Sequence, residues 1–502
     1  RIMFRKLALL LSMMLIFSLV LVACGGDETE EPADEPAVQE PADEPAEEPA
    51  EEPAEEPAEE PMEEPSGEKT VLNFWSFTDE LNTMATAYEG MNPDVQIDYT
   101  MIPMTAGEYQ TKLLASLGTD DSPDLIALEA AFVKEYVESD FLADVGDLMK
   151  YAEEAGTYQF VIDVGTDDGV TKAYAFQATP GAFFYRRSLA EEYLGTSDPA
   201  EVQALLGDFD KFTEAAATIK EASGGDTYMV ASNGDFTNLF FANRAQPWIV
   251  DGEMVIDPKV DEYIAVSKIF RDEDYEAQAT QWQEGWFAGM NDSLVDAEGN
   301  AKQIFGYFLP TWGLPFVLAP NAVAADGSSD TSGDWGVIEG PLPYQWGGTW
   351  IGALAESDNL DAAKDFIRFA TLDMDNLRNW ATGVYTNEYL TAIDPDFPPE
   401  QAQAPGDFVS SQVVVEEIIP LFDDSDLSAF LGGQNSYGGF AAAAPSVNAS
   451  LMTGADDAIQ RAMQDPMNQY LNGEITLEEM FAAWKDAVRI EFPDLVDRKS
   501  VV

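Results

Sequence analysis

The stretch Val71-Leu72-Asn73-Phe74-Trp75 opens the globular part of the chain and decides its fold class. Its apolar run predicts a short strand. Apolar residues within 81–88 then recur at the i, i+3, i+4 and i+7 spacing of one helical face, and a glycine and a proline end that helix. The alternation continues with a strand at 95–101, a helix at 109–117 and a strand at 124–128. Such alternation indicates an α/β protein with a mainly parallel sheet covered by helices.

Helical patterns return later in the chain. Apolar residues line one face of 209–219, which Asp208 can cap, and one face of 360–370. Thr476 and Glu479 form a capping-box pattern before the last helix. The segment between 280 and 350 is rich in proline, glycine and aromatic residues and predicts loops and short strands. Because the part after residue 68 is longer than one core usually holds, we expect two lobes.

The first residues are typical of a secretory signal peptide. A positive start is followed by an apolar run at 7–22, which is short for a membrane-spanning helix, and by small residues before Cys24. The segment resembles the bacterial lipoprotein signal, whose lipobox matches Leu21, Ala23 and Cys24. That resemblance implies cleavage after residues 1–23 and lipidation of Cys24, for example by palmitate. The alternative is an uncleaved membrane anchor with a buried, inert cysteine.

Residues 24–68 predict a disordered tether. The repeat Glu-Glu-Pro-Ala dominates the segment, and it contains no basic residue. Its like charges repel and its prolines favour extended backbone, so no packed core is expected there. A cell-wall-binding motif is the alternative, and only the charge supports it.

Composition excludes several kinds of chemistry. The 502 residues include one cysteine and no histidine, so an intrachain disulfide, histidine-bound zinc and Ser-His-Asp or Cys-His catalysis are excluded. The net charge of −68 argues against nucleic acid and anionic lipid head groups as partners of the folded surface. The tether accounts for less than a third of this charge. Carboxylate-pair chemistry and calcium binding by oxygen ligands remain open on composition alone, although we expect no cofactor and no metal.

Six stretches of the chain follow one another in a recognisable order. They are Val71 to Ser76, Asn92-Pro93-Asp94-Val95, Ser122-Pro123-Asp124-Leu125, Ala173 to Arg187, Gly336 to Gly348 with the helix from Asp361 to Leu372, and Gly473-Glu474-Ile475-Thr476. Each stretch alone is a common pattern, but in this order they resemble the family 1 extracellular solute-binding proteins of ABC importers, the relatives of maltose-binding protein. The chain departs from the family around Gln281 to Gly306, where Gln-Trp-Gln-Glu-Gly-Trp replaces a glycine-lysine segment.

The resemblance implies a two-lobe α/β fold of the periplasmic-binding-protein type (type II), with the ligand in a cleft and a hinge between the lobes. Crossovers are expected near Thr179, Asp334 and Thr382. The expected lobes are 69–178 with 335–382, and 179–334 with 383–502. Implied partners are a small-molecule ligand, expected to be a carbohydrate, and ABC permease subunits with their ATPase. We expect a monomer held by lipid on the outer face of the cell membrane, or on the periplasmic side where a second membrane exists.

Candidate ligand contacts are aromatic or polar residues at strand ends and in the family's site stretches. Sugar rings pack on aromatic planes while their hydroxyls take hydrogen bonds, so a sugar cleft needs both kinds of group. The resemblance adds the two aromatics that match stacking positions of the family. The candidates are Trp75 and Ser76 after the first strand, Glu129 after the third, Tyr185 and Trp312 from the resemblance, Trp346 and Trp350 around Gly347-Gly348, and Tyr437 in a glycine-rich stretch.

Each candidate has an ordinary structural alternative. Trp75 is equally consistent with a core position, and Glu129 with a solvated loop charge. One tryptophan of the pair 346 and 350 is expected to face the cleft while the other packs. The glycines around Tyr437 are more typical of a mobile loop than of a binding loop. Trp282 and Trp286 are four residues apart and could share one helical face, which favours core or lobe surface over the ligand site.

Two further functions remain open. The same fold can hold a cationic solute such as a betaine or polyamine by cation–π contacts, and a ring of carboxylates around the tryptophans would favour that reading over a sugar. A surface glycoside hydrolase with two carboxylates is the third alternative. Neither a distinct carboxylate pair nor eight regular βα units is visible in the sequence, so we expect a binding protein without catalytic residues.

Overall fold

Two β-sheets organise the part of the chain that the structure describes. The computed structural model describes residues 69–398, 406–493 and 495, so the signal peptide, Cys24 and the tether lie outside the described residues. The larger sheet has the strand order β2 (Val95–Met101), β1 (Thr70–Ser76), β3 (Leu125–Glu129), β14 (Thr349–Ala353), β6 (Ala173–Ala175). The smaller sheet has the order β12 (Gly306–Pro310), β7 (Gly181–Arg186), β13 (Trp335–Ile338).

Three short two-stranded ladders complete the strands. They are β4 (Thr166–Asp167) with β5 (Val170–Thr171), β8 (Thr227–Tyr228) with β11 (Gln303–Ile304), and β9 (Ile249–Val250) with β10 (Glu253–Met254).

The first half of the larger sheet confirms the predicted alternation. β1 pairs in parallel with β2 and with β3. The intervening helices are α2 (Glu80–Met91) and α3 (Glu108–Ser116), close to their predicted ranges. β14 and β6 join the sheet in antiparallel pairs, and the smaller sheet is antiparallel throughout. Because β3 ends at Glu129, its carboxyl end presents this side chain at the edge of the sheet.

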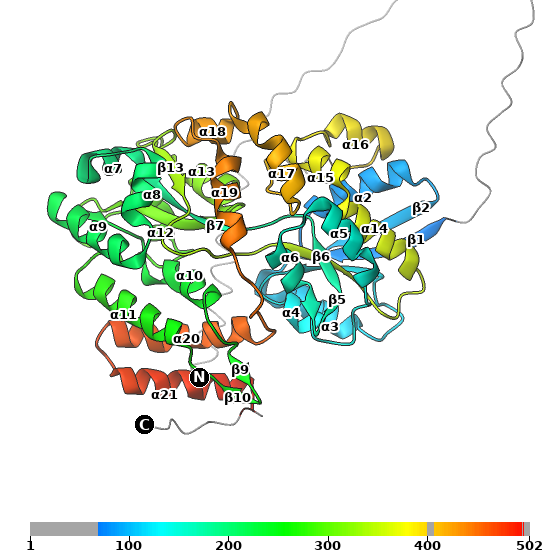
Figure 1. The fold of residues 1–502 in the computed structure, drawn as a ribbon, viewed down its shortest axis with the longest axis horizontal. Coiled ribbons are helices and arrows are strands. Elements are labelled where there is room, and N and C mark those ends of the chain that lie inside the picture. The colour runs from blue at the N-terminus through cyan, green and yellow to red at the C-terminus, as the bar shows by residue number, and fades with distance from the viewer. Residues whose placement is uncertain (1–68, 399–405, 494, 496–502) are drawn as a thin grey trace, which may run out of the picture. The chain divides into compact units, whose positions relative to one another are not determined.

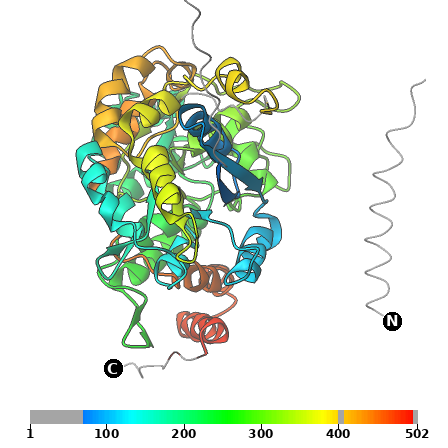
Figure 2. The ribbon, with the colours of Figure 1, turned by 90° about the vertical axis from the view of Figure 1, so that its right-hand side faces the viewer.

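Helices surround the larger sheet and bury one hydrophobic core. α14 (Leu360–Leu372) packs over β14, β6 and β1, and Figure 2 shows this yellow helix beside the blue strands β1 and β2. Its buried residues, such as Phe366 and Ile367, contribute to the core that also holds Leu72 and Phe74. The other helices near this sheet are α4 (Val133–Val137), α5 (Met149–Ala155), α6 (Gln159–Val164), α15 (Met374–Ala381), α16 (Asn387–Ile393) and α17 (Gln412–Ile418).

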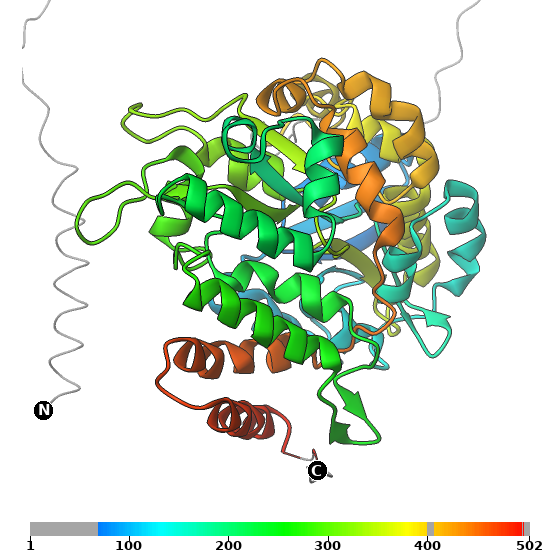
Figure 3. The same cartoon turned by 60° about the vertical axis from the view of Figure 1, so that its left-hand side comes forward.

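A second core lies around the smaller sheet. Its centre is an aromatic cluster in which Phe183 of β7, Phe212 of α9 (Phe209–Ala222) and Phe308 of β12 are mutual neighbours. α20 (Asp456–Leu471) packs between α11 (Pro258–Asp272) and α21 (Leu477–Glu491), as Figure 3 shows. The remaining helices of this part include α7 (Arg187–Leu194), α8 (Pro199–Leu206), α10 (Thr237–Ala242), α12 (Glu284–Ala288), α18 (Asp426–Phe430) and α19 (Ser436–Ala443).

Local helix signals explain where two of these helices begin. The Asp208 carboxylate accepts the Lys211 backbone N–H at the start of α9. At the start of α21, Thr476 accepts the Glu479 N–H and the Glu479 carboxylate accepts the Thr476 N–H. Both predicted caps are confirmed, because they satisfy backbone donors that have no partner within the helix.

The two sheets with their helices form two lobes, which Figure 1 shows side by side. The first crossover lies near Thr179, between β6 and β7. β13 pairs with β7 in the smaller sheet, so the return to the larger sheet follows residue 338 and does not begin at 335. Beyond residue 383, α16 packs on α2 and α17 packs on α15, so this segment still belongs with the larger sheet. The third crossover therefore lies between α17 and α19, later than Thr382, since α19 packs on β7 and β13.

Candidate functional site

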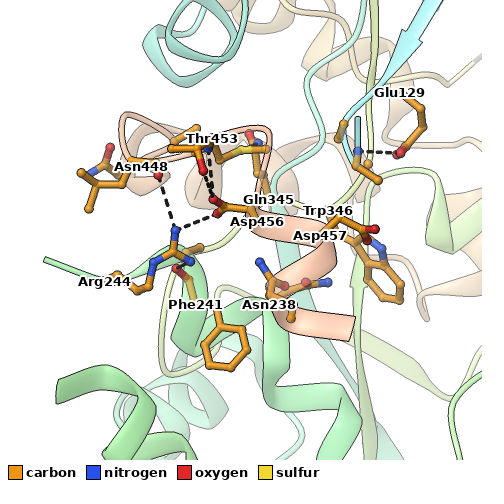
Figure 4. A pocket seen from close by; sticks show the side chains of 18 residues that line it. Glu129, Asn238, Phe241, Arg244, Gln345, Trp346, Asn448, Thr453, Asp456 and Asp457 are labelled. Atoms are coloured by element: carbon orange, nitrogen blue, oxygen red, sulfur yellow. Dashed lines mark hydrogen bonds and ion pairs between the residues drawn. The ribbon is translucent and has the colours of Figure 1, made fainter. Parts of the chain in front are cut away.

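A pocket lies where elements of the two lobes meet (Figure 4). One wall is the end of β3, and the opposite walls are α10 and the first turns of α20. The crossover segment between β13 and β14 passes along the pocket, tied to the first crossover by the hydrogen bond from the Trp346 N–H to the Thr179 carbonyl. The lining residues are Glu129, Ala130, Ala131, Asn238, Phe241, Ala242, Arg244, Gln345, Trp346, Gly347, Asn448, Ala449, Leu451, Met452, Thr453, Asp456, Asp457 and Gln460.

Arg244 and Asp456 form a buried clamp in the wall of the pocket. The Arg244 guanidinium donates to Asp456 Oδ2 at 2.7 Å and to the Phe241 carbonyl, and it lies 4.3 Å from the centre of the Trp248 ring. Asp456 Oδ1 accepts from the Thr453 backbone N–H and hydroxyl. The guanidinium and the carboxylate are therefore both bound by protein groups. The pair shapes the pocket wall and does not present a charge to a ligand.

Glu129 presents a carboxyl group to the pocket from the end of β3. One oxygen accepts the Ala131 backbone N–H at 2.7 Å. Burial against the pocket wall raises the pKa of Glu129 to about 7, and the negative charge of Asp457 adds to the rise. Near neutral pH the group is thus divided between a neutral form that donates a hydrogen bond and a charged form that accepts several.

Gln345 supplies a buried polar atom that lacks a partner among the described residues. Its side-chain nitrogen donates to the Met452 sulfur, while its oxygen Oε1 accepts no hydrogen bond within the part of the chain that the structure describes. The residue is only 8% exposed and lines the pocket. A buried acceptor left without a donor costs ~1–3 kcal/mol, and a hydroxyl group of a ligand would supply that donor.

Three tryptophans form a cluster beside the pocket. Trp346 lines the pocket, and its ring centre lies 5.4 Å from that of Trp312 and 5.7 Å from that of Trp282. Trp282 and Trp312 are almost parallel, with an interplanar angle of 10° and centroids 6.2 Å apart. The Trp312 indole N–H donates to the Trp346 carbonyl at 2.9 Å. This bond fixes Trp312 and Trp346 relative to one another.

Gly347 lets the Trp312 ring lie close to the backbone, because a Cβ atom on Gly347 would lie 2.6 Å from the Trp312 indole nitrogen. Gly347 also has a φ of +78°, which favours glycine.

The structure places Trp75 and Ser76 outside this pocket. Trp75 lines a separate hollow together with Asn73 and Lys112, and the Lys112 ammonium lies 5.3 Å from its ring centre. Ser76 is fully buried, and its hydroxyl donates to the Thr78 carbonyl. Of the candidates at strand ends, only Glu129 reaches the pocket.

Three further aromatic candidates are core residues in this conformation. Tyr185 is fully buried and donates to the Ser197 carbonyl. Trp350 is 1% exposed and donates to the Val161 carbonyl, so it is the packed member of the pair with Trp346. Tyr437 lies in the first turn of α19, stacks on Phe422 at 4.4 Å and donates to the Asp407 carbonyl. Their burial and their protein partners argue against direct ligand contact.

Several pocket residues were not among the predicted ones. The amides Asn238, Gln345, Asn448 and Gln460 and the carboxylate Asp457 come from loops and helix faces whose polar residues look like ordinary surface.

The sequence does contain one usable signal for Trp282. It lies in the segment that departs from the family pattern, whereas its four-residue spacing from Trp286 pointed to a shared helical face. The helix α12 begins only at Glu284, so Trp282 precedes it.

The fold and the pocket define an α/β protein of the two-lobe periplasmic-binding-protein type, with a pocket between the lobes. The sequence matches the bacterial extracellular solute-binding proteins over residues 75–376, and the chain belongs to this family. It is thus an extracellular solute-binding protein of the kind that serves ABC transporters. In the described residues, no helix is both long and apolar enough to cross a membrane. Among curated protein sequences, none matches the chain.

Solved structures confirm the fold. A family 1 extracellular solute-binding protein superposes with a TM-score of 0.64 at 17% identity, covering 85% of this chain and 100% of that one. The sugar-binding protein MalE from Xanthomonas citri gives 0.61 at 16% identity, covering 85% and 97%. The cyclic alpha-maltosyl-1,6-maltose binding protein from Arthrobacter globiformis gives 0.59 at 17%, covering 84% and 98%. At these identities the likeness concerns the fold alone.

Proposed function

We propose that the chain is a lipid-anchored lipoprotein that binds a sugar or oligosaccharide in the pocket between its lobes and delivers it to an ABC permease with its ATPase. The observation that carries the proposal is the pocket itself, whose lining includes both the aromatic residue Trp346 and Gln345 with its unpartnered side-chain oxygen. Flat aromatic surface and unsatisfied hydrogen-bonding groups are what a sugar requires. MalE and the maltosyl-maltose binding protein, which share the fold, are sugar binders by name.

The polar lining favours a sugar over a cation. Four amide side chains, Asn238, Gln345, Asn448 and Gln460, line the pocket. Of the carboxylates there, Asp456 is neutralised by Arg244, which leaves Glu129 and Asp457. Amides both donate and accept hydrogen bonds, as sugar hydroxyls demand, whereas a cation site calls for a ring of carboxylates.

Calorimetric titration of the purified protein tests the ligand class. The panel contains mono- and oligosaccharides of glucose, galactose and xylose, together with glycine betaine and spermidine. We expect heat from at least one sugar and none from the two cations. The absence of a heat signal with every sugar would refute the carbohydrate proposal. Heat from betaine or spermidine would instead indicate a cationic solute as the ligand.

A pair of matched variants tests the site. Trp346→Ala removes a ring that lines the pocket, and we expect at least about a tenfold loss of affinity, or ~1.4 kcal/mol. Trp75→Ala removes the same side chain from a separate hollow and serves as the control, with unchanged affinity. Equal losses in both variants would assign the effect to general destabilisation, and the reverse order would place the ligand elsewhere.

Anchoring and the absence of catalysis have separate tests. We expect the full chain to incorporate labelled palmitate and to sediment with membranes, and Cys24→Ser to abolish both. Release of the variant together with retention of the label would contradict lipidation at Cys24. We propose binding without turnover, so prolonged incubation with a bound oligosaccharide should leave it intact, and hydrolysis products would revive the glycoside hydrolase alternative.

A further inference from the structure

Trp282 is an exposed tryptophan held in a backbone conformation that tryptophan disfavours. Its φ is +65°, in the left-handed region, and its side chain is 45% exposed. It is the third residue of a turn closed by the hydrogen bond from the Gln283 N–H to the Thr280 carbonyl, a position where glycine or asparagine is usual when φ is positive. Such a conformation costs ~1–3 kcal/mol and persists only where the surroundings enforce it.

The surroundings of Trp282 do enforce it. The carboxylate of Asp235 accepts from the Gln281 amide at 3.4 Å and from the Trp286 indole N–H at 3.2 Å, so residues on both sides of Trp282 bind one buried group. The Trp282 ring itself leans on Trp286 at 5.1 Å. The ring also neighbours those of Phe287, Trp312 and Trp346, and 45% of the residue stays exposed to solvent. Fold stability alone does not account for a strained and exposed tryptophan at this point.

Trp282 continues the aromatic surface of the pocket. Its ring lies next to that of Trp346, which lines the pocket, and almost parallel to that of Trp312. The exposed amide of Gln283 follows directly in the sequence. A flat ring with an adjacent amide repeats outside the pocket the combination that Trp346 and Gln345 make inside it. A ligand seated against Trp346 that extends beyond the pocket would meet Trp282 next.

We propose that Trp282 forms a second sugar subsite, which stacks the next ring of a chain whose first ring occupies the pocket. The protein is then selective for oligosaccharides of two or more rings over monosaccharides. This inference rests on the proposed sugar-binding function and goes beyond it by naming the size class of the ligand.

Titration of the full-length protein with homologous series of one to four rings tests the inference. The probes are glucose, maltose, maltotriose and maltotetraose, with the matching xylose and galactose series. For the series that binds, we expect the affinity of the unmodified protein to rise about tenfold from one ring to two. Trp282→Ala should remove this rise and leave the affinity for the monosaccharide unchanged. Trp346→Ala should weaken every member of the series.

Two controls separate a subsite from simple packing. Trp282→Leu keeps apolar contact with Trp286 but offers no flat face, so it should behave as Trp282→Ala does, whereas Trp282→Phe should retain part of the rise. Equal losses at every chain length, or full affinity for oligosaccharides in Trp282→Leu, would overturn the inference while leaving sugar binding intact. An unmodified protein that binds no sugar of any length would overturn both the inference and the proposed function.

Discussion

Glu129 makes folding stability depend on pH in a direction that can be worked out from its surroundings. Its pKa is raised from 4.5 to about 7 in the folded protein, so the folded state holds a proton that the unfolded state has released over this interval. Stability falls with rising pH wherever the folded state binds more protons. The unfavourable contribution is therefore absent below about pH 4.5, grows between the two values and is complete above pH 7.

The magnitude follows from the size of the rise. At about 1.4 kcal/mol per tenfold change in proton affinity, the full rise corresponds to ~3 kcal/mol. Solvent reaches part of the Glu129 side chain, and screening reduces the effective value to ~1–2 kcal/mol. Glu129→Gln removes the charge and keeps an oxygen that can accept the Ala131 N–H. The variant should match the unmodified protein near pH 4.5 and exceed its free energy of unfolding by ~1–2 kcal/mol at pH 8.

Urea unfolding followed by tryptophan fluorescence, at half-unit steps from pH 4.5 to pH 8, measures the difference. Glu191→Gln is the matched control, because Glu191 is an exposed carboxylate on α7 away from the pocket, and its curve should run parallel to that of the unmodified protein. A Glu129→Gln curve that also runs parallel would refute the reasoning. If the stability of Glu129→Gln relative to the unmodified protein fell between pH 4.5 and pH 8, the predicted sign of the pH dependence would be wrong.

Three further substitutions test the pocket and the core. Gly347→Ala drives a Cβ into the Trp312 indole and strains a positive φ, so we expect a loss of ~1–3 kcal/mol in urea unfolding together with weaker sugar binding by calorimetry. Arg244→Gln leaves the Asp456 charge buried without its partner, and a loss of ~3–5 kcal/mol in the same unfolding assay is expected, whereas a neutral effect would contradict the clamp. Trp350→Phe should lower the free energy of unfolding by ~1–3 kcal/mol, because the hydrogen bond to the Val161 carbonyl is lost, and should leave sugar affinity unchanged. Weaker sugar binding by the stably folded variant would indicate that Trp350 contacts the ligand.

The parts of the fold that the sequence predicted correctly depend on local patterns. The strand and helix alternation after Val71 and the caps at Asp208 and Thr476 each depend on residues within a few positions of one another. The antiparallel entry of β14 and β6 depends on pairing between segments far apart in the chain, which no local pattern encodes. The same holds for the crossovers, where β13 joins β7 only because the tertiary fold brings them together.

The candidate site shows the same division. Glu129 was found because the carboxyl end of a strand meets the ligand edge of an α/β sheet, and it lines the pocket. The same rule named Trp75 and Ser76, whose side chains point to other surroundings, since strand position fixes where a residue lies but not what faces it. Tyr185 and Trp350 were chosen as aromatics near expected ligand positions. Burial, which decides between stacking on a ligand and packing in a core, becomes visible only in the folded chain.

Trp282 shows how a physical conflict can point to a candidate binding residue that periodicity overlooks. The four-residue spacing to Trp286 described a helical face, and helical residues have negative φ. A tryptophan with a φ of +65° cannot belong to that face, and its exposure excludes the core. Backbone strain and solvent exposure both oppose stability, whereas the bonds of Gln281 and Trp286 to Asp235 maintain the arrangement. A feature that costs stability and is nonetheless held in place by buried bonds is best explained by an interaction outside the free protein, and the ring that it holds adjoins Trp346 at the pocket.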